Sequence, residues 1–309
     1  MSVVVLAYHE MGCTGLRALL RHAVPVSAVF TYADDPAENC WFGSVAALAR
    51  EAGLPVHVTE SINDARWVEH IAALRPDAIF SFYYRHLVGR AIRALPRLGA
   101  FNLHGSLLPR YRGRCPVNWQ LVHGERESGV TLHEMTGRAD AGDIVDQERV
   151  TVGPDDTALE LYQRLNAAAD VLLDRQLGAL LAGRAPRTPQ DESQASVFGG
   201  RRPEDGRIDW SWPRARIHDL VRAVAPPWPG AFSELADGPL MLWRTRPAAD
   251  LAAPPLEPGV VRIAGRAVHV GTGDDPLELL EWTAPAGRAL RPGERLAVRT
   301  SARRTEIRT

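Results

Sequence analysis

The N-terminal half of the chain alternates apolar runs with amphipathic stretches, and this rhythm limits its possible folds more than any other feature. Residues 3–8 and 78–84 are almost wholly apolar, which is typical of strands buried on both faces of a sheet. We expect two more strands at 24–32 and 56–59, and helices at 44–52 and 67–74. Strands that alternate with helices predict an α/β fold with a doubly wound, mostly parallel sheet.

The pattern changes in the second half of the chain. A long helix is expected at residues 160–182, capped by Asp155 or Asp156 and ended by Gly183. A segment rich in Pro, Gly, Gln and Ser follows it and is typical of a linker.

Beyond the linker we expect a helix at 214–225 and then short strands between Gly and Pro turns, at 240–243, 260–263, 267–270 and 277–282. Short, closely spaced strands favour a small β-barrel or sandwich. The sequence therefore predicts an N-terminal catalytic domain over residues 1–200. It predicts a smaller C-terminal domain, a linking helix and a β-barrel, over residues 201–309.

Composition excludes several classes of protein. The 36 basic residues, all arginine, nearly balance 37 acidic ones, and the net charge of −1 argues against bulk binding of nucleic acid. Cys13, Cys40 and Cys115 lie far apart, so they indicate neither a zinc site nor a disulfide framework. No apolar run reaches the ~20 residues of a membrane span. We expect a cytoplasmic protein without a bound metal.

Asn102 and His104 stand at the end of a predicted buried strand. Side chains two residues apart in a strand point to the same side, so an amide and an imidazole would face one site. An amide can hold the oxyanion of an acyl-transfer intermediate, and an imidazole can move its proton near neutral pH. Spacing alone leaves open a polar strand end without a catalytic role.

Two loops could complete such a site. Asp140 lies in a glycine-flanked loop and could orient His104 and favour its charged imidazolium form, although an Asx turn is the alternative, which fits Asp143 better. Arg112 and Arg114 could bind a phosphate or carboxylate, or could be solvated side chains of a mobile loop.

Other motifs give no functional signal. The chain has neither a GxGxxG fingerprint nor a P-loop lysine motif. Six scattered histidines lack the spacing of metal ligands and are expected to be structural or exposed: His57, His70, His123, His133, His218 and His269.

The combination of Asn102, His104, the Ser-Leu-Leu-Pro run at 106–109 and Asp140 resembles the folate-dependent formyltransferase family. That family includes methionyl-tRNA, glycinamide ribonucleotide and sugar N-formyltransferases. The resemblance implies a Rossmann-like fold and 10-formyltetrahydrofolate as formyl donor. It also implies that His104 is the acid/base, Asn102 stabilises the transition state, and Asp140 favours the charged form of His104.

Further segments resemble one branch of the family, enzymes that formylate UDP-4-amino-4-deoxy-L-arabinose for lipid A modification in polymyxin resistance. They are residues 8–13, 80–87, 111–114, 138–142, 198–199, 221–224 and 227–232. In that branch a decarboxylase domain follows, and because this chain ends at Thr309 it is either a stand-alone enzyme or an excised domain.

The same resemblance implies which residues bind the donor. Two segments line the folate site, and Arg114 matches a ligand-binding position without indicating which ligand. The segments are His86, Leu87 and Val88, and the loop of Thr136, Gly137, Arg138, Ala139 and Asp140.

Four alternatives remain at this point. The acceptor could be methionyl-tRNA or another UDP- or dTDP-linked 4-amino sugar. The chain could also be a formyl-folate hydrolase or a folate-binding module without activity, although binding alone needs no proton shuttle. We expect a nucleotide-linked amino sugar as partner, no nucleic acid and no membrane span, and leave a homo-oligomer open.

Overall fold

The structure, a computed structural model, describes residues 1–33, 39–248 and 255–297, and the chain forms two units. Unit 1 comprises Met1–Gly113, Glu127–Thr151 and Gln163–Phe198. Unit 2 comprises Arg114–Arg126, Val152–Tyr162 and Gly199–Thr309. The chain therefore passes between the units more than once, and the last passage lies between Phe198 and Gly199.

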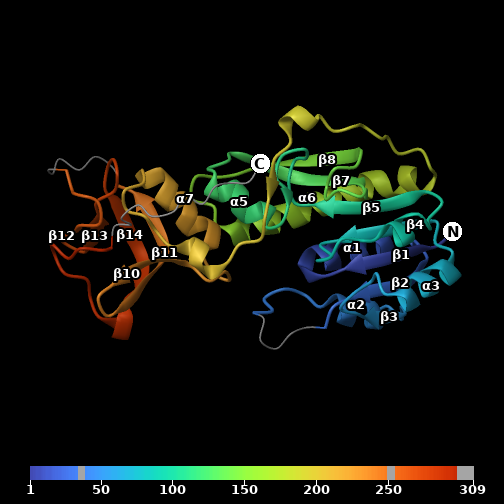
Figure 1. The fold of residues 1–309 in the computed structure, drawn as a ribbon, viewed down its shortest axis with the longest axis horizontal. Coiled ribbons are helices and arrows are strands. Elements are labelled where there is room, and N and C mark those ends of the chain that lie inside the picture. Colours follow the sequence, from blue (N-terminus) through green and yellow to red (C-terminus); the bar gives the residue numbers. More distant parts are fainter. Residues whose placement is uncertain (34–38, 249–254, 298–309) are drawn as a thin grey trace. The chain divides into compact units, whose positions relative to one another are not determined.

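A seven-stranded sheet forms the centre of unit 1, in the order β3-β2-β1-β4-β5-β7-β8 (Figure 1). The first five strands of this order are parallel, whereas β7 and β8 run antiparallel to their neighbours. The expected doubly wound, mostly parallel sheet is thus confirmed. The strands are β1 (Val3–Ala7), β2 (Val26–Thr31), β3 (Val56–Val58), β4 (Ala78–Phe82), β5 (Gly99–His104), β7 (Glu127–Glu134) and β8 (Ile144–Thr151).

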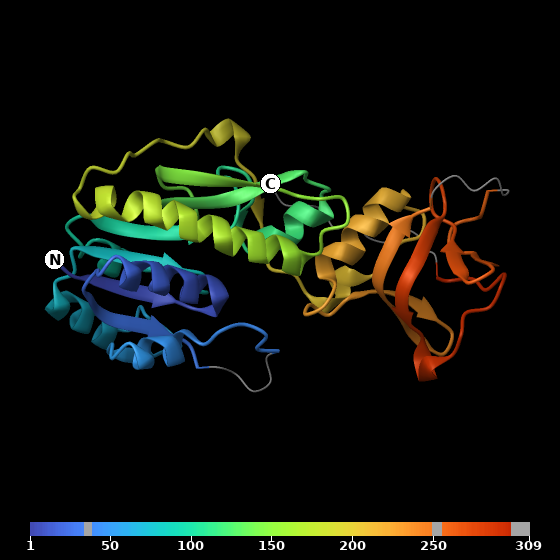
Figure 2. The same cartoon turned by 180° about the vertical axis from the view of Figure 1, so that it is seen from behind.

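Helices cover both faces of this sheet. On one face α1 (His9–Arg21) and α6 (Ala158–Leu181) lie side by side (Figure 2), and Thr14 Oγ1 donates to Asn166 Oδ1 at 3.2 Å. On the other face α3 (Ala65–Leu74) and α4 (Arg90–Arg93) pack onto a buried cluster of Val4, Leu6, Phe30 and Ile79. Alternate residues of β1 therefore serve opposite faces, which is why this strand is apolar throughout. The remaining elements of unit 1 are α2 (Val45–Glu51), β6 (Arg112–Gly113) and β9 (Val197–Phe198).

Unit 2 contains a five-stranded antiparallel sheet in the order β10-β11-β14-β13-β12. Trp210 is wholly buried in this unit, and its indole N–H donates to Ser233 Oγ at 2.9 Å. The expected β-rich C-terminal part is confirmed. Among the described residues the sheet is open rather than a closed barrel, because β10 and β12 lie at its opposite edges. Its elements are α5 (Pro116–Val122), α7 (Arg214–Val224), β10 (Ala231–Leu235), β11 (Gly238–Pro247), β12 (Val261–Ala264), β13 (Ala267–Val270) and β14 (Leu277–Thr283).

The start of α6 differs from the expectation. Thr157 and Glu160 cap it reciprocally: Glu160 Oε2 accepts from the Thr157 N–H at 2.8 Å, and Thr157 Oγ1 accepts from the Glu160 N–H at 3.4 Å. Asp156 instead accepts a hydrogen bond from the Gly153 N–H, because the preceding turn folds back on it. Across the described residues, no helix combines the length and apolar character that crossing a membrane requires.

Candidate active site

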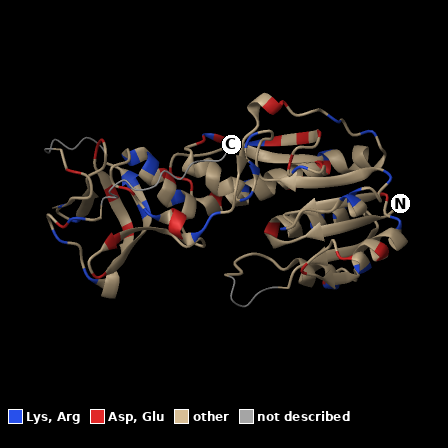
Figure 3. Cartoon of the chain, viewed as in Figure 1, with Lys and Arg blue, Asp and Glu red and all other residues tan. Residues whose placement is uncertain are grey.

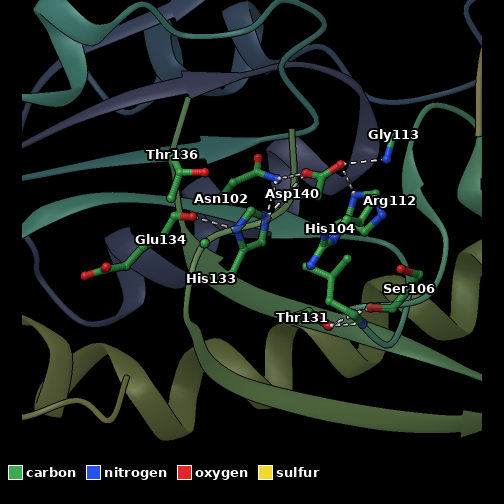
Figure 4. A network of polar contacts seen from close by, with 12 residues as sticks. Asn102, His104, Ser106, Arg112, Gly113, Thr131, His133, Glu134, Thr136 and Asp140 are labelled. Atoms are coloured by element: carbon green, nitrogen blue, oxygen red, sulfur yellow. Dashed lines mark hydrogen bonds and ion pairs between the residues drawn. The ribbon is translucent and has the colours of Figure 1, made fainter. Parts of the chain in front are cut away.

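Asn102 and His104 lie near the end of β5, between β4 and the antiparallel β7 (Figure 4). His104 is 6% exposed and Asn102 is half-buried. Their spacing of two residues places both side chains on the same side of the strand, as the sequence predicts.

The loop after β5 fixes the ring of His104. Its Nε2 lies 2.8 Å from the carbonyl oxygen of Tyr111, which can only accept, so this nitrogen carries a proton. Its Nδ1 faces Asp140 Oδ2 at 3.6 Å. Both ring nitrogens therefore face oxygen atoms, one of a backbone carbonyl and the other of a carboxylate.

Asp140 is held in a left-handed backbone conformation with φ of 52°. Its Oδ2 accepts from the Gly113 N–H at 2.8 Å, and its Oδ1 accepts from Asn102 Nδ2 at 3.4 Å. Burial by itself raises the pKa of this carboxyl group. Interactions with His104, with His133 and with the Gly113 N–H outweigh burial and hold the pKa of Asp140 well below its usual range.

His133 belongs to the site, although the sequence places it among the scattered structural histidines. It is 1% exposed and pairs directly with Asn102 across β5 and β7. Its Nδ1 donates to the Glu134 carbonyl at 2.8 Å, so in the neutral ring Nε2 accepts from Asn102 Nδ2 at 3.1 Å. The same Nε2 lies 3.4 Å from Asp140 Oδ1. Only the register of an antiparallel pair brings these residues together, and a single sequence carries no such signal.

The first segment assigned to the donor by resemblance follows β4. Leu87 is 67% exposed, unusually open for a large apolar side chain, whereas Val88 is buried and His86 is exposed. Arg93 donates from Nε to the Val88 carbonyl at 2.9 Å and from Nη1 to the Met135 carbonyl at 3.5 Å. One guanidinium thus joins this segment to the residue that precedes the second segment.

The second segment is a surface loop that leads into Asp140. Thr136, Gly137 and Arg138 are exposed, and Ala139 and Asp140 are half-buried. Thr136 Oγ1 donates to the Arg138 carbonyl at 3.0 Å, which closes a tight turn. The structure therefore brings the two predicted donor segments close to each other and leads the second one directly into the carboxylate beside His104.

The two arginines of the following loop have different surroundings. Arg112 is 3% exposed, and its Nη2 donates to Gln190 at 2.7 Å and to Glu192 at 3.0 Å. The alternative of a solvated side chain is wrong, because Arg112 is buried and protein groups accept from four of its five guanidinium N–H groups. That it binds an anionic ligand stays a prediction. Arg114 opens the first segment of unit 2 and is exposed, and a Cβ placed on Gly200 would lie 3.2 Å from its Cζ. That Arg114 binds a ligand stays a prediction.

The arrangement has the parts that acyl transfer needs. The carboxylate of Asp140 lies within hydrogen-bonding reach of the Asn102 amide and within charge-pairing reach of the His104 imidazole. In the part of the chain that the structure describes, no group of three or more His, Cys, Asp and Glu side chains could hold a metal ion. The side chains of Asn102, His104 and Asp140 can stabilise an oxyanion and move a proton.

Two family models match the chain. The model described as formyl transferase matches residues 5–177, and the model described as formyl transferase, C-terminal domain, matches residues 201–298. Together they span most of the sequence.

Solved structures share the fold. An N-formyltransferase from Helicobacter canadensis, in complex with folinic acid and dTDP-3-aminofucose, is 17% identical with a TM-score of 0.70; the match covers 90% of this chain and 98% of that one. A sugar N-formyltransferase from a Shewanella species is 19% identical with a TM-score of 0.64, covering 82% and 99%. HypX from Aquifex aeolicus, in complex with tetrahydrofolic acid, is 20% identical with a TM-score of 0.62, covering 92% of this chain and 44% of that one.

Proposed function

The chain belongs to the formyl transferase family, and from this premise we propose that it transfers a formyl group from 10-formyltetrahydrofolate to the amine of a nucleotide-linked sugar. The observation that carries the proposal is that Asp140 contacts both Asn102 and His104 at the end of β5. A folate-binding module without activity would have no use for a charge-paired histidine beside an oriented amide.

The donor is proposed to bind along the two segments that Arg93 joins. Leu87 offers an exposed apolar surface for the flat ring system of a folate, and residues 136–140 offer backbone groups around it. Because the turn closed by Thr136 leads into Asp140, the formyl group of the bound donor would lie beside Asp140.

The reaction proposed for these residues is direct transfer. The unprotonated amine attacks the formyl carbon, a new C–N bond forms, and the bond between that carbon and the folate nitrogen breaks. His104 takes the proton from the attacking nitrogen and returns it to the departing folate nitrogen, while Asp140 stabilises the imidazolium in between.

Asn102 is proposed to hold the oxyanion of the tetrahedral intermediate. Its amide nitrogen lies 3.1 Å from His133 Nε2 and 3.4 Å from Asp140 Oδ1. The longer contact is the weaker one. The N–H that points at Asp140 would therefore donate to the oxyanion in its place. The shorter bond to His133 keeps the amide oriented during this exchange.

For the acceptor we propose UDP-4-amino-4-deoxy-L-arabinose, as the sequence segments of that branch imply, with a dTDP-linked amino sugar as the alternative. Two solved structures that match over nearly their whole chains are a sugar N-formyltransferase and an N-formyltransferase in complex with dTDP-3-aminofucose. The role in lipid A modification and polymyxin resistance is part of the same proposal, as is a cytoplasmic location.

Methionyl-tRNA is a poorer acceptor for this chain. Binding of tRNA draws on a surplus of basic side chains, whereas the net charge here is −1. Basic and acidic residues are interspersed along both units (Figure 3). Such a distribution gives little sequence-independent attraction for a polyanion.

The test is an acceptor panel with one formyl donor. Purified protein and 10-formyltetrahydrofolate are incubated with the UDP-linked sugar, a dTDP-4-amino sugar or methionyl-tRNA, and products are followed by mass spectrometry. We expect a formylated nucleotide sugar and no formyl-methionyl-tRNA, and we expect His104→Ala to be folded but inactive. Formate release without an acceptor would indicate a hydrolase, and product only from tRNA would overturn the proposal.

A further inference from the structure

Gln190 lies in the segment that the sequence presents as a simple linker, yet its side chain contacts the backbone around Asp140. Its Nε2 donates to the Asp140 carbonyl at 2.8 Å and to the Gly142 carbonyl at 2.7 Å. Its Oε1 accepts from Arg112 Nε at 3.1 Å and from Arg112 Nη2 at 2.7 Å. The amide has two N–H groups and two lone pairs, and all four are used.

These contacts fix the direction of the amide. The oxygen faces only donors on Arg112, and the nitrogen faces only carbonyl oxygens, so the reverse orientation would lose every one of these bonds. Gln190 thus links the buried guanidinium of Arg112 to the loop that carries Asp140, and its amide can have only one orientation.

Arg112 in turn is held firmly. It is 3% exposed, and its Nη1 and Nη2 donate to the two carboxylate oxygens of Glu192 at 3.2 and 3.0 Å. Glu192 also pairs with Arg138 at 2.6 Å. Hydrogen bonds from Arg112 and then from Arg138 lower the pKa of Glu192 well below its usual range, so it stays charged.

The contacts form a closed ring around Asp140. The Gly113 N–H holds the carboxylate at Oδ2, and the neighbouring Arg112 holds the backbone carbonyl of the same residue through Gln190. Figure 4 shows Arg112, Gly113 and Asp140 together. Both ends of Asp140 are therefore fixed from β6, and Asp140 also has a left-handed φ of 52°, which favours only a few residue types and needs support from its surroundings.

We propose that Gln190 is a positioning residue, which sets the carboxylate of Asp140 against His104 by holding the Asp140 and Gly142 carbonyls. The inference rests on the proposed function, because it assumes that the pair of Asp140 and His104 moves the proton. Gln190 forms no hydrogen bond with His104 or Asn102, and its link to the site is through the backbone of the loop.

The experiment uses Gln190→Ala and Gln190→Glu in the full chain. An ionised glutamate can accept from Arg112 but cannot donate to the two carbonyls. We therefore expect both variants to lower kcat by about 10- to 100-fold, the range in which small misplacements of a reacting group fall, with KM for the sugar nucleotide within about twofold.

Gln176→Ala is the matched control, since it removes another half-buried amide that donates to Asp146 at 2.8 Å in the same unit. Its kcat should stay within about twofold of the wild type.

A double variant separates positioning from general support of the fold. If Gln190 acts through the Asp140 carboxylate, Gln190→Glu should cost less than about twofold in single-turnover rate when Asp140→Asn is already present. Additive losses, or full activity of Gln190→Glu alone, would overturn the inference.

A second readout does not depend on turnover. Hydrogen–deuterium exchange of peptides that cover residues 136–142 should accelerate in Gln190→Ala and stay unchanged in Gln176→Ala. Unchanged exchange in Gln190→Ala would also contradict the inference. Should the wild type transfer no formyl group to any sugar, faster exchange would still show that Gln190 holds the loop, and only the proposed function would have failed.

Discussion

The charge of Asp140 is the residue-scale feature with the clearest physical consequence. Burial raises the pKa of this carboxyl group. His104, His133 and the Gly113 N–H lower it by more, so its pKa in the folded chain lies below the unfolded value of about 3.9. A depressed folded-state pKa means that the carboxylate contributes stability above the unfolded pKa and loses it as the pH falls through the folded pKa.

We therefore predict a pH-dependent stability difference between the wild type and Asp140→Asn. The difference in free energy of unfolding should be nearly constant from about pH 5 to pH 8. It should shift in favour of the variant below about pH 4, where the unfolded wild type binds a proton at Asp140 while the folded wild type still keeps this carboxylate charged. Asparagine tolerates the left-handed φ of 52°, so the variant should still fold. Urea unfolding across this pH range measures the effect, and a difference that does not change on acidification would contradict it.

The second residue-scale prediction concerns His133. His133→Ala removes the acceptor of the Asn102 amide, so the amide loses its orientation and kcat should fall by about tenfold, the loss of roughly one hydrogen bond. His133→Gln offers an amide oxygen that can accept from Asn102, and it should recover part of the loss. Steady-state kinetics of both variants measure this, and equal activity of the two would assign His133 to packing alone.

Sequence reasoning reached part of this site. The grouping of Asn102 with His104 could be predicted, because it depends only on the two-residue period of a strand. His133 and Gln190 could not be predicted, because one depends on the register of β5 and β7 and the other on a loop returning to Asp140 from 50 residues away. The partners of Arg112 could not be predicted for the same reason, because Gln190 and Glu192 are distant from it in sequence.

At the scale of elements, local patterns predicted most of the secondary structure. β1 and β4 are apolar runs and α6 has a regular apolar periodicity, so their limits lie within a few residues of the expected ones. The pairing of β5 with β7 and of β6 with β9 was not predicted, because those contacts form between distant segments.

The packing of α1 on the sheet gives an element-scale prediction. A Cβ on Gly15 would lie 2.3 Å from the ring of Phe82, which is wholly buried, so Gly15→Ala should destabilise the chain by about 1–3 kcal/mol through overpacking. Gly178 in α6 is the matched control: it has no atom within 4 Å of a built Cβ, and Gly178→Ala should stabilise by about 0.5–1 kcal/mol. Urea unfolding compares them, and effects of the same sign would refute the close approach of α1 to β4.

At the scale of the whole molecule, the sequence indicates two parts with a boundary at residue 200. The final passage between units lies close by, after Phe198, but residues 114–126 and 152–162 also belong to unit 2. Composition could not reveal that these two segments belong to unit 2. The linker-like sequence marks only the last place where the chain passes from one unit to the other. The domain limits expected from the sequence stay a prediction.

A fragment of residues 1–200 tests those limits. It keeps α5 and residues 152–162 but lacks α7, so Asn118 loses its 2.7 Å hydrogen bond to the Ala223 carbonyl, and the Asp156 carbonyl loses its 3.0 Å bond from Arg222. We expect the fragment to unfold at lower urea concentration than the full chain and over a broader transition, followed by circular dichroism. Asn118→Ala should destabilise the full chain by about 1–3 kcal/mol, because it leaves a buried carbonyl unsatisfied, and should leave the fragment almost unchanged. A fragment as stable as the full chain would instead establish residues 1–200 as an independent domain.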